Sequence, residues 1–134
     1  IPAVFLHPSE AQHGDLGILQ ENDVLLLISN SGKTREIVEL TTLAARLNPS
    51  LKKIVITGNA ESPLAQAADI CLFTGHPDEV CVLGMTPTTS TTVMTVMGDI
   101  LVVETMKQTQ FTIEEYSKRH HGGYLGERSR ELSK

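Results

Sequence analysis

The fold is decided by one stretch, Leu25-Leu26-Leu27-Ile28-Ser29-Asn30-Ser31-Gly32-Lys33-Thr34-Arg35-Glu36-Ile37. It continues an apolar run, residues 24–28, that is too short for a helix and typical of a buried parallel strand. Small polar residues around one glycine follow, and from Glu36 onward apolar residues recur at helical spacing. The stretch therefore predicts a strand, a tight turn and the start of a helix.

The turn in this stretch, residues 29–34, has the chemistry of an anion site, and we call it the cradle. A helix start presents backbone N–H groups without intrahelical acceptors, at the positive end of the helix dipole. Ser29, Ser31 and Thr34 add hydroxyls, so a phosphate is the expected ligand. An ordinary serine-capped helix after a strand would show the same pattern. The glycine and lysine spacing of the phosphate loop of nucleotide hydrolases is absent.

Further strands and helices alternate along the chain. Strands are predicted at residues 4–6, 24–28, 53–57 and 70–73. Helices are predicted at about residues 35–47, 62–68 and 91–107, the first ending before Pro49 because proline disfavours a helical predecessor. This alternation predicts an α/β fold with a parallel sheet and helices on its faces, the 91–107 helix covering one of them.

Composition and charge exclude several classes of protein. A chain of 134 residues forms at most one domain with a real core, and its net charge of −5 argues against nucleic acid as a partner.

Cys71 and Cys81 suit a reducing cytoplasm and form neither a disulfide framework nor a zinc site. No apolar run is long enough to span a membrane, and no metal or cofactor is expected. Because the chain opens on an apolar run without an initiator methionine, we expect it to be a fragment of a longer protein.

Several motifs occur in one order along nearly the whole chain. They are His7-Pro8-Ser9-Glu10-Ala11-Gln12-His13-Gly14-Asp15-Leu16-Gly17, Ser29-Asn30-Ser31-Gly32, Glu79-Val80-Cys81-Val82-Leu83-Gly84, Thr86-Pro87-Thr88-Thr89-Ser90-Thr91-Thr92, Met97-Gly98-Asp99 and His120-His121-Gly122-Gly123-Tyr124-Leu125-Gly126. Together they resemble the sugar isomerase (SIS) domain, and within it the arabinose-5-phosphate isomerases.

This resemblance implies a flavodoxin-like, three-layer α/β/α domain with a parallel sheet over residues 1–134. It implies interconversion of ribulose 5-phosphate and arabinose 5-phosphate, which feeds Kdo and lipopolysaccharide or capsule synthesis. Family members are commonly cytoplasmic homotetramers without a cofactor. The family's N-terminal helix and its glycine-rich loop with an active-site lysine would precede Ile1.

Residue by residue, the resemblance implies catalytic roles for His13, Glu36, Glu79 and His120. It implies phosphate binding by Ser29, Ser31 and Thr34, with Thr88, Thr89 and Ser90 as secondary substrate contacts. The chain departs from the family at His121, where proline is usual, and at Lys33, where an acidic or small residue is common. Lys33 makes the cradle more positive.

Aldose–ketose isomerisation moves a proton between adjacent carbons through a cis-enediol and needs a base. A carboxylate partly buried in a loop can have its pKa raised toward neutrality. Glu79 is the preferred base, because its loop is expected to face the cradle across a cleft. Glu36 is the second candidate, although a glutamate at a helix start also complements the dipole. His13 and His120 could move hydroxyl protons, although a lone histidine is more often structural.

Two other functions fit the same cradle. One is a non-catalytic sugar-phosphate-binding SIS module, as found in some transcriptional regulators, and the other is a hexose-phosphate isomerase. The joint presence of Glu79, His13 and His120, without a helix-turn-helix segment, favours the isomerase. The expected partners are a small sugar phosphate and further copies of this chain, with neither nucleic acid nor membrane.

Overall fold

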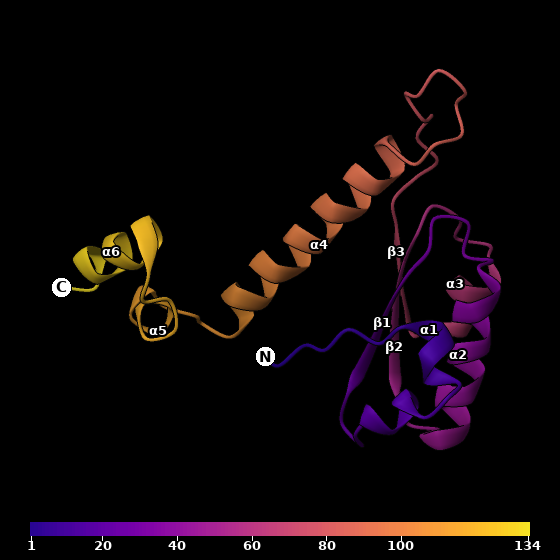
Figure 1. The fold of residues 1–134 in the computed structure, drawn as a ribbon, viewed down its shortest axis with the longest axis horizontal. Helices are drawn as coiled ribbons and strands as arrows, with labels where there is room; N and C mark the ends of the chain where they lie inside the picture. Colours follow the sequence, from indigo (N-terminus) through magenta and orange to yellow (C-terminus); the bar gives the residue numbers. More distant parts are fainter. The chain divides into compact units, whose positions relative to one another are not determined.

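The computed structural model describes residues 1–134, and its contacts group them into two units, residues 1–97 and 98–134. The first unit contains, in order, α1 (Pro8–Ala11), the 3-10 helix η1 (Asp15–Ile18), β1 (Val24–Ile28), α2 (Arg35–Leu47), β2 (Lys52–Thr57), α3 (Pro63–Ala67) and β3 (Ile70–Phe73) (Figure 1). Helix α4 (Thr89–Gln108) crosses the boundary between the units. The second unit contains α5 (Ile113–Ser117) and α6 (Gly123–Leu132).

The three strands form one parallel sheet in the order β1-β2-β3. In the register of the sheet, Leu27 lies beside Val55, and Val55 lies beside Cys71. Parallel neighbours need a crossover connection, and α2 and α3 supply the two crossovers. The predicted α/β class with a parallel sheet is therefore confirmed, and each predicted strand after residue 20 is present.

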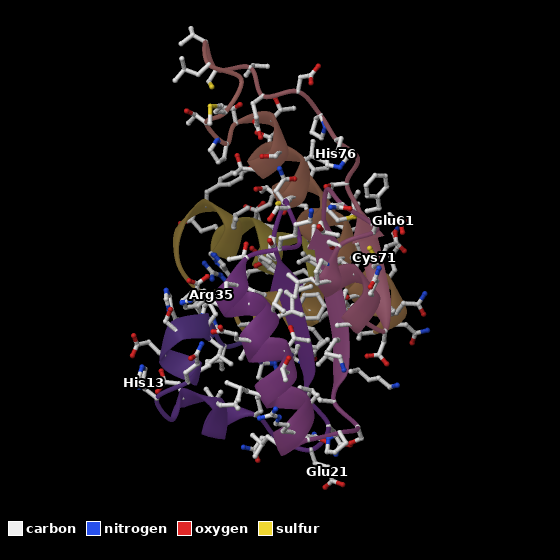
Figure 2. The ribbon with its side chains drawn as sticks, turned by 90° about the vertical axis from the view of Figure 1, so that its right-hand side faces the viewer. His13, Glu21, Arg35, Glu61, Cys71 and His76 are labelled. Atoms are coloured by element: carbon white, nitrogen blue, oxygen red, sulfur yellow. The ribbon has the colours of Figure 1, made fainter.

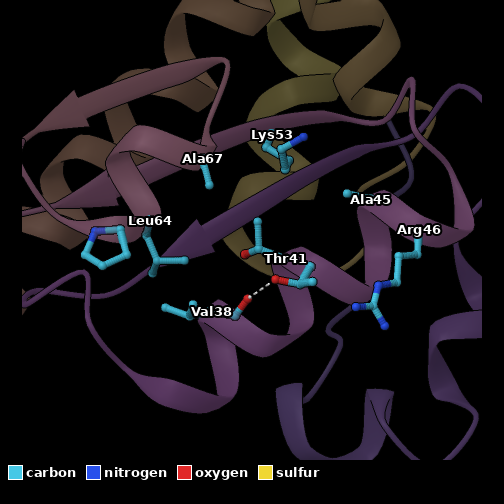
Figure 3. Close-up of a pocket in the computed structure, with 9 residues that line it drawn as sticks. Val38, Thr41, Ala45, Arg46, Lys53, Leu64 and Ala67 are labelled. Carbon is cyan, nitrogen blue, oxygen red and sulfur yellow. Dashed lines mark hydrogen bonds between the residues drawn. The ribbon is translucent and has the colours of Figure 1, made fainter.

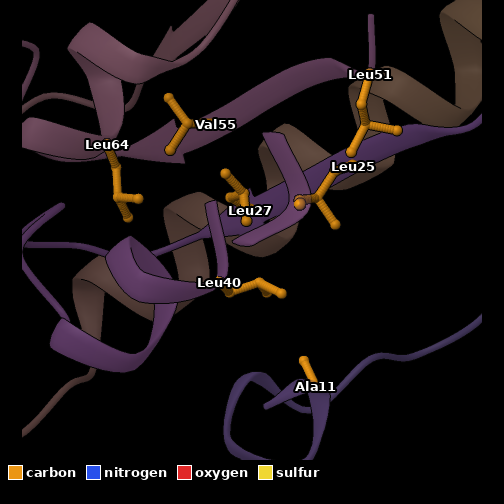
Figure 4. Close-up of a cluster of buried hydrophobic side chains, with 8 residues drawn as sticks. Ala11, Leu25, Leu27, Leu40, Leu51, Val55 and Leu64 are labelled. Carbon is orange, nitrogen blue, oxygen red and sulfur yellow. The ribbon is translucent and has the colours of Figure 1, made fainter. Parts of the chain in front are cut away.

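The core lies on one face of the sheet, under the helices. Leu25 and Leu27 of β1 pack in one cluster with Leu40 of α2 and Leu64 of α3 (Figure 4). Burying a side chain of this size stabilises a fold by about 1.5–3 kcal/mol. Helix α2 forms because its apolar residues return every three to four positions, so that one face can be buried on the sheet. This packing fixes the start of α2 beside the carboxyl end of β1.

The other face of the sheet differs from what the sequence predicts. Val24, Leu26 and Ile28 are 55, 46 and 51% exposed, so β1 alternates between buried and exposed residues. An apolar run alone cannot show whether one or both faces of a strand are covered. Helix α4 confirms the helix predicted near residues 91–107, and its covering of a sheet face stays a prediction.

The strand predicted at residues 4–6 is wrong. Residues 1–7 form no strand, and Val4 and Phe5 are 68 and 84% exposed. A short apolar segment becomes a strand only when a neighbour pairs with it, and no strand pairs here. The segment instead leads into α1, where the His7 imidazole accepts a hydrogen bond from the Ser9 N–H.

The second unit has a helical pair of its own, in which α5 packs against α6. Gly126 of α6 lies so close to the preceding turn that a Cβ there would be 2.7 Å from the His121 carbonyl oxygen. Glycine is therefore required where α6 packs on the turn that precedes it. No helix in the chain combines the length and the apolar character needed to cross a membrane.

Candidate functional site

The cradle is closed by hydrogen bonds among its own residues. Ser29 follows β1 and is buried, and its Oγ lies 2.8 Å from Thr34 Oγ1. The same Ser29 oxygen accepts the Gly32 N–H at 3.2 Å. The Ser31 side chain is exposed, and its Oγ accepts the Lys33 N–H at 3.1 Å. The structure thus brings the predicted phosphate-binding hydroxyls into one short loop.

The start of α2 is open to a ligand. Thr34 is the N-cap residue, but its hydroxyl caps no backbone N–H group, and its carbonyl accepts the N–H groups of Ile37 and Val38. The N–H groups of Arg35 and Glu36 have no hydrogen-bond acceptor within the chain. With the exposed Lys33 and Arg35 side chains beside it, this helix start is suited to bind an anion.

The position of the cradle in the fold also suits a ligand. Open α/β sheets bind ligands outside the carboxyl ends of their strands. The cradle follows the carboxyl end of β1, at the same edge as the loops after β2 and β3. Figure 2 shows this edge by His76, beyond β3, at the end of the sheet opposite to Glu21, which precedes β1.

Glu36 stands in the first turn of α2, at the mouth of the cradle. Its side chain is 41% exposed, and its carboxylate lies 3.9 Å from the Arg35 guanidinium. This contact is long and solvent-exposed, so it holds the carboxylate only weakly. The Glu36 side chain is therefore free to turn toward a ligand in the cradle.

The surroundings of Glu79 lower its pKa, whereas the sequence predicts a raised pKa for this candidate base. Its Oε2 accepts hydrogen bonds from the Thr88 N–H and hydroxyl, both at 2.7 Å, and from the Ser90 N–H at 3.4 Å. Hydrogen bonding by Ser90, and then by Thr88, lowers the pKa of Glu79 to about 2. The expected rise in the pKa of Glu79 is thus corrected to a fall, because donors surround the carboxylate and little of it is desolvated. Its role as a base stays a prediction.

The secondary candidates are brought together with Glu79. Thr88 also accepts the Val80 N–H through its hydroxyl, at 3.1 Å, which ties both ends of the loop to one side chain. Thr89 is the first residue of α4, and Ser90 is buried at 3% exposure. Glu79 therefore caps the start of α4. The threonine-rich helix entrance indicated a cap, but nothing local pointed to an acceptor nine residues away.

The two histidine candidates are exposed and belong to different units. His13 lies in the turn after α1, where only its backbone N–H is bonded, to the Glu10 carbonyl at 2.8 Å (Figure 2). His120 follows α5 and stacks on Tyr116, with ring centroids 5.4 Å apart and ring planes 10° apart. The exposed His120 ring makes no side-chain hydrogen bond within the chain.

The loop that holds Glu79 also holds the thiol of Cys81, for which the sequence predicts only the role of a small side chain. Cys81 Sγ accepts the N–H groups of Met85 and Thr86, at 3.3 and 3.1 Å. These bonds, the Met85 N–H first, lower the pKa of the Cys81 thiol to about 7. No set of His, Cys, Asp and Glu side chains is arranged to hold a metal ion.

The first unit also has a groove on the side of the sheet that carries the helices. A groove of about 420 Å³ runs between α2, α3 and β2 (Figure 3). Val38, Thr41 and Leu64 line its middle, and Arg46 and Lys53 are also on its wall. None of the site residues predicted from the sequence lies in it.

Residues 2–104 match the SIS domain. This chain belongs to the SIS domain family. Arabinose 5-phosphate isomerase KdsD of Pseudomonas aeruginosa is 47% identical over 127 residues, which are 95% of this chain and 38% of that protein. KdsD of Escherichia coli K12 is 47% identical over 125 residues, 93% of this chain and again 38% of the relative. This SIS chain thus spans little more than a third of the length of these curated relatives.

Two solved structures share the fold of this SIS chain. A Bacteroides fragilis protein named as a phosphosugar isomerase involved in capsule formation is 84% identical, with a TM-score of 0.89 over 92% of this chain and 65% of that one. The c3406 protein of Escherichia coli, solved in complex with arabinose 5-phosphate, is 34% identical, with a TM-score of 0.80 over 87% of this chain and 61% of that one.

Proposed function

We propose that this chain is the phosphosugar-binding part of an aldose–ketose isomerase. Its reaction interconverts ribulose 5-phosphate and arabinose 5-phosphate through a cis-enediol. One observation carries the proposal: the uncapped start of α2 faces a loop with three hydroxyls at the ligand-binding edge of a parallel sheet. The similarity to proteins named arabinose 5-phosphate isomerase supports this choice of sugar.

The phosphate binds to the cradle. The free N–H groups of Arg35 and Glu36 donate to its oxygens, and the hydroxyls of Ser29, Ser31 and Thr34 supply further donors. Charged acceptors strengthen such bonds to about twice the strength of neutral ones. Thr88, Thr89 and Ser90, the secondary substrate contacts, bind the sugar through their hydroxyls. A phosphate held at this end leaves the sugar carbons outside the loop, within reach of side chains at its mouth.

Two carboxylates compete for the role of carbon base. Glu79 is the base preferred from the sequence, and its hydrogen bonds keep it ionised and ready to accept a proton. The same bonds lower its basicity, which weighs against it. Glu36, partly exposed at the mouth of the cradle, is the alternative base. His13 and His120 move the hydroxyl protons.

The reaction supplies arabinose 5-phosphate for Kdo and for lipopolysaccharide or capsule synthesis. The similarity to a Bacteroides fragilis protein named for capsule formation supports this use. The protein is cytoplasmic and works as a homotetramer. In this proposal the reaction uses no cofactor, because carboxylates and histidines suffice to move a proton between adjacent carbons.

One observation favours a second candidate function, a non-catalytic sugar-phosphate-binding module. A carboxylate with a pKa of about 2 that caps a helix can be wholly structural. A module of this kind keeps the cradle and needs no base.

A substrate panel separates the candidates. The full-length protein is assayed with ribulose 5-phosphate, arabinose 5-phosphate and several hexose phosphates. Interconversion of the two pentose phosphates is expected. Turnover of hexose phosphates alone would replace the substrate, and tight binding of a sugar phosphate without turnover would establish the regulatory module.

A further inference from the structure

The cradle rests on two buried hydroxyl side chains that come from other elements. Thr57 ends β2 and Ser62 precedes α3, and both are 0% exposed. Neither can touch a ligand from the solvent side. They lie beneath the cradle, to which the phosphate is proposed to bind. They can therefore affect the phosphate only through the backbone of the cradle.

Thr57 joins the loops that follow two neighbouring strands. Its Oγ1 donates to the Asn30 carbonyl at 3.2 Å and accepts the Asn59 N–H at 3.2 Å. The Gly58 N–H donates to the same Asn30 carbonyl, at 3.0 Å. The buried Thr57 hydroxyl and the Gly58 N–H therefore together hold the second residue of the cradle, Asn30, against the end of β2.

The middle of the cradle, at Gly32, is also packed closely against other elements. Gly32 has φ +63°, and a Cβ there would overlap the side chain of Ser62 and lie 3.0 Å from Thr57 Oγ1. The Gly32 carbonyl accepts the Leu64 N–H of α3, at 3.3 Å. The loop therefore has no space to move inward.

We propose that Thr57 is a positioning residue for the phosphate. By holding the Asn30 carbonyl, its hydroxyl fixes the path of the loop before the phosphate arrives. The Arg35 and Glu36 N–H groups, which have no acceptor in the chain, and the Ser29 hydroxyl then already lie in a fixed loop when the anion binds. Preorganisation of this kind raises affinity because no ordering is left for binding to do. The inference rests on the proposed function only in taking phosphate as the ligand of the cradle.

The test compares Thr57→Val, which keeps the shape of the side chain and removes the hydroxyl, with Thr57→Ser, which keeps the hydroxyl. In the full-length protein, we expect Thr57→Val to raise the Kd for inorganic phosphate and the KM for ribulose 5-phosphate about five- to tenfold, the loss of one to two hydrogen bonds. The kcat should stay within about twofold, because ground-state and transition-state binding fall together. Thr57→Ser should restore both constants.

Thr41 offers a matched control. It is 5% exposed, and its Oγ1 donates at 2.8 Å to the Ile37 carbonyl of its own helix, so Thr41→Val also removes a buried, bonded hydroxyl. We expect Thr41→Val to lower the melting temperature and to leave the phosphate Kd unchanged. Titrations are run below the melting temperature of each variant, and Thr57→Ala serves as a second variant without the hydroxyl.

The outcomes separate this inference from the proposed function. An unchanged phosphate Kd in Thr57→Val, an equal rise in Thr41→Val, or a failure of Thr57→Ser to restore the Kd overturns the positioning role. A wild-type protein that binds no phosphate overturns it as well. A wild-type protein that binds phosphate without isomerising sugar phosphates contradicts the isomerase alone, since the phosphate Kd is measured without turnover.

Discussion

At the scale of single residues, Glu79 can act as a general base or as a helix cap, and the two roles need different properties of its carboxylate. A base needs a carboxylate that is ionised and also basic, whereas a helix cap needs only an ionised acceptor. The hydrogen bonds from Thr88 and Ser90 satisfy the second requirement and oppose the first. Two predictions at this scale separate the roles.

Glu79→Gln keeps the size of the side chain and removes its basicity. If Glu79 is the carbon base, kcat falls by about a hundred- to ten-thousandfold, and the substrate stays bound. Exchange of the reacting C–H proton with solvent, followed by NMR, should stop. Near-normal exchange would make Glu79 structural, and Glu36→Gln, as the matched variant, should then show the large fall.

The lowered pKa of Glu79 also predicts a pH-dependent stability. The folded carboxyl has a pKa of about 2, below its ordinary value of 4.5, so it binds protons less readily when folded. Its contribution is therefore fully present above pH 4.5 and is lost as the pH falls toward 2. The free energy of unfolding, measured against pH, should fall more steeply below pH 4.5 in the wild type than in Glu79→Gln. Parallel curves would show that the cap is not formed in solution.

At the scale of elements, the sequence pattern predicted those strands and helices that form from interactions between residues close in the sequence. The strands at residues 24–28, 53–57 and 70–73 and the helix after the cradle were predicted, because apolar periodicity and a turn of small polar residues set them. The segment at residues 4–6 shows the limit, since an apolar triplet needs a partner strand that no local pattern reveals. The link between Glu79 and α4 was hidden for the same reason: it spans a loop.

The contact between the cradle and α3 is tested by a pair of glycines. Gly32 and Gly75 both have positive φ, +63° and +78°, but only at Gly32 would a Cβ meet other atoms. Gly75→Ala should cost about 1–2 kcal/mol for the left-handed backbone alone. Gly32→Ala should cost about 1–3 kcal/mol more, because the added methyl overlaps Ser62. Urea unfolding measures both, and equal losses would contradict the close packing of the cradle on α3.

At the scale of the whole molecule, this chain holds the proposed phosphate site and several candidate proton carriers. The cradle, Glu36 and Glu79 belong to the first unit, and His120 belongs to the second. Their order along the sequence could be recognised from motifs, whereas their arrangement around one sugar could not, because it depends on how units and subunits assemble. The proposed reaction is thus a property of the full-length protein.

The most direct test follows ribulose 5-phosphate with the full-length protein in deuterium oxide by NMR. We expect arabinose 5-phosphate to form with solvent deuterium at C2, since a base that moves a proton through a cis-enediol can exchange that proton with solvent. Ribulose 5-phosphate that binds and remains unchanged would contradict the assignment of this chain to an aldose–ketose isomerase.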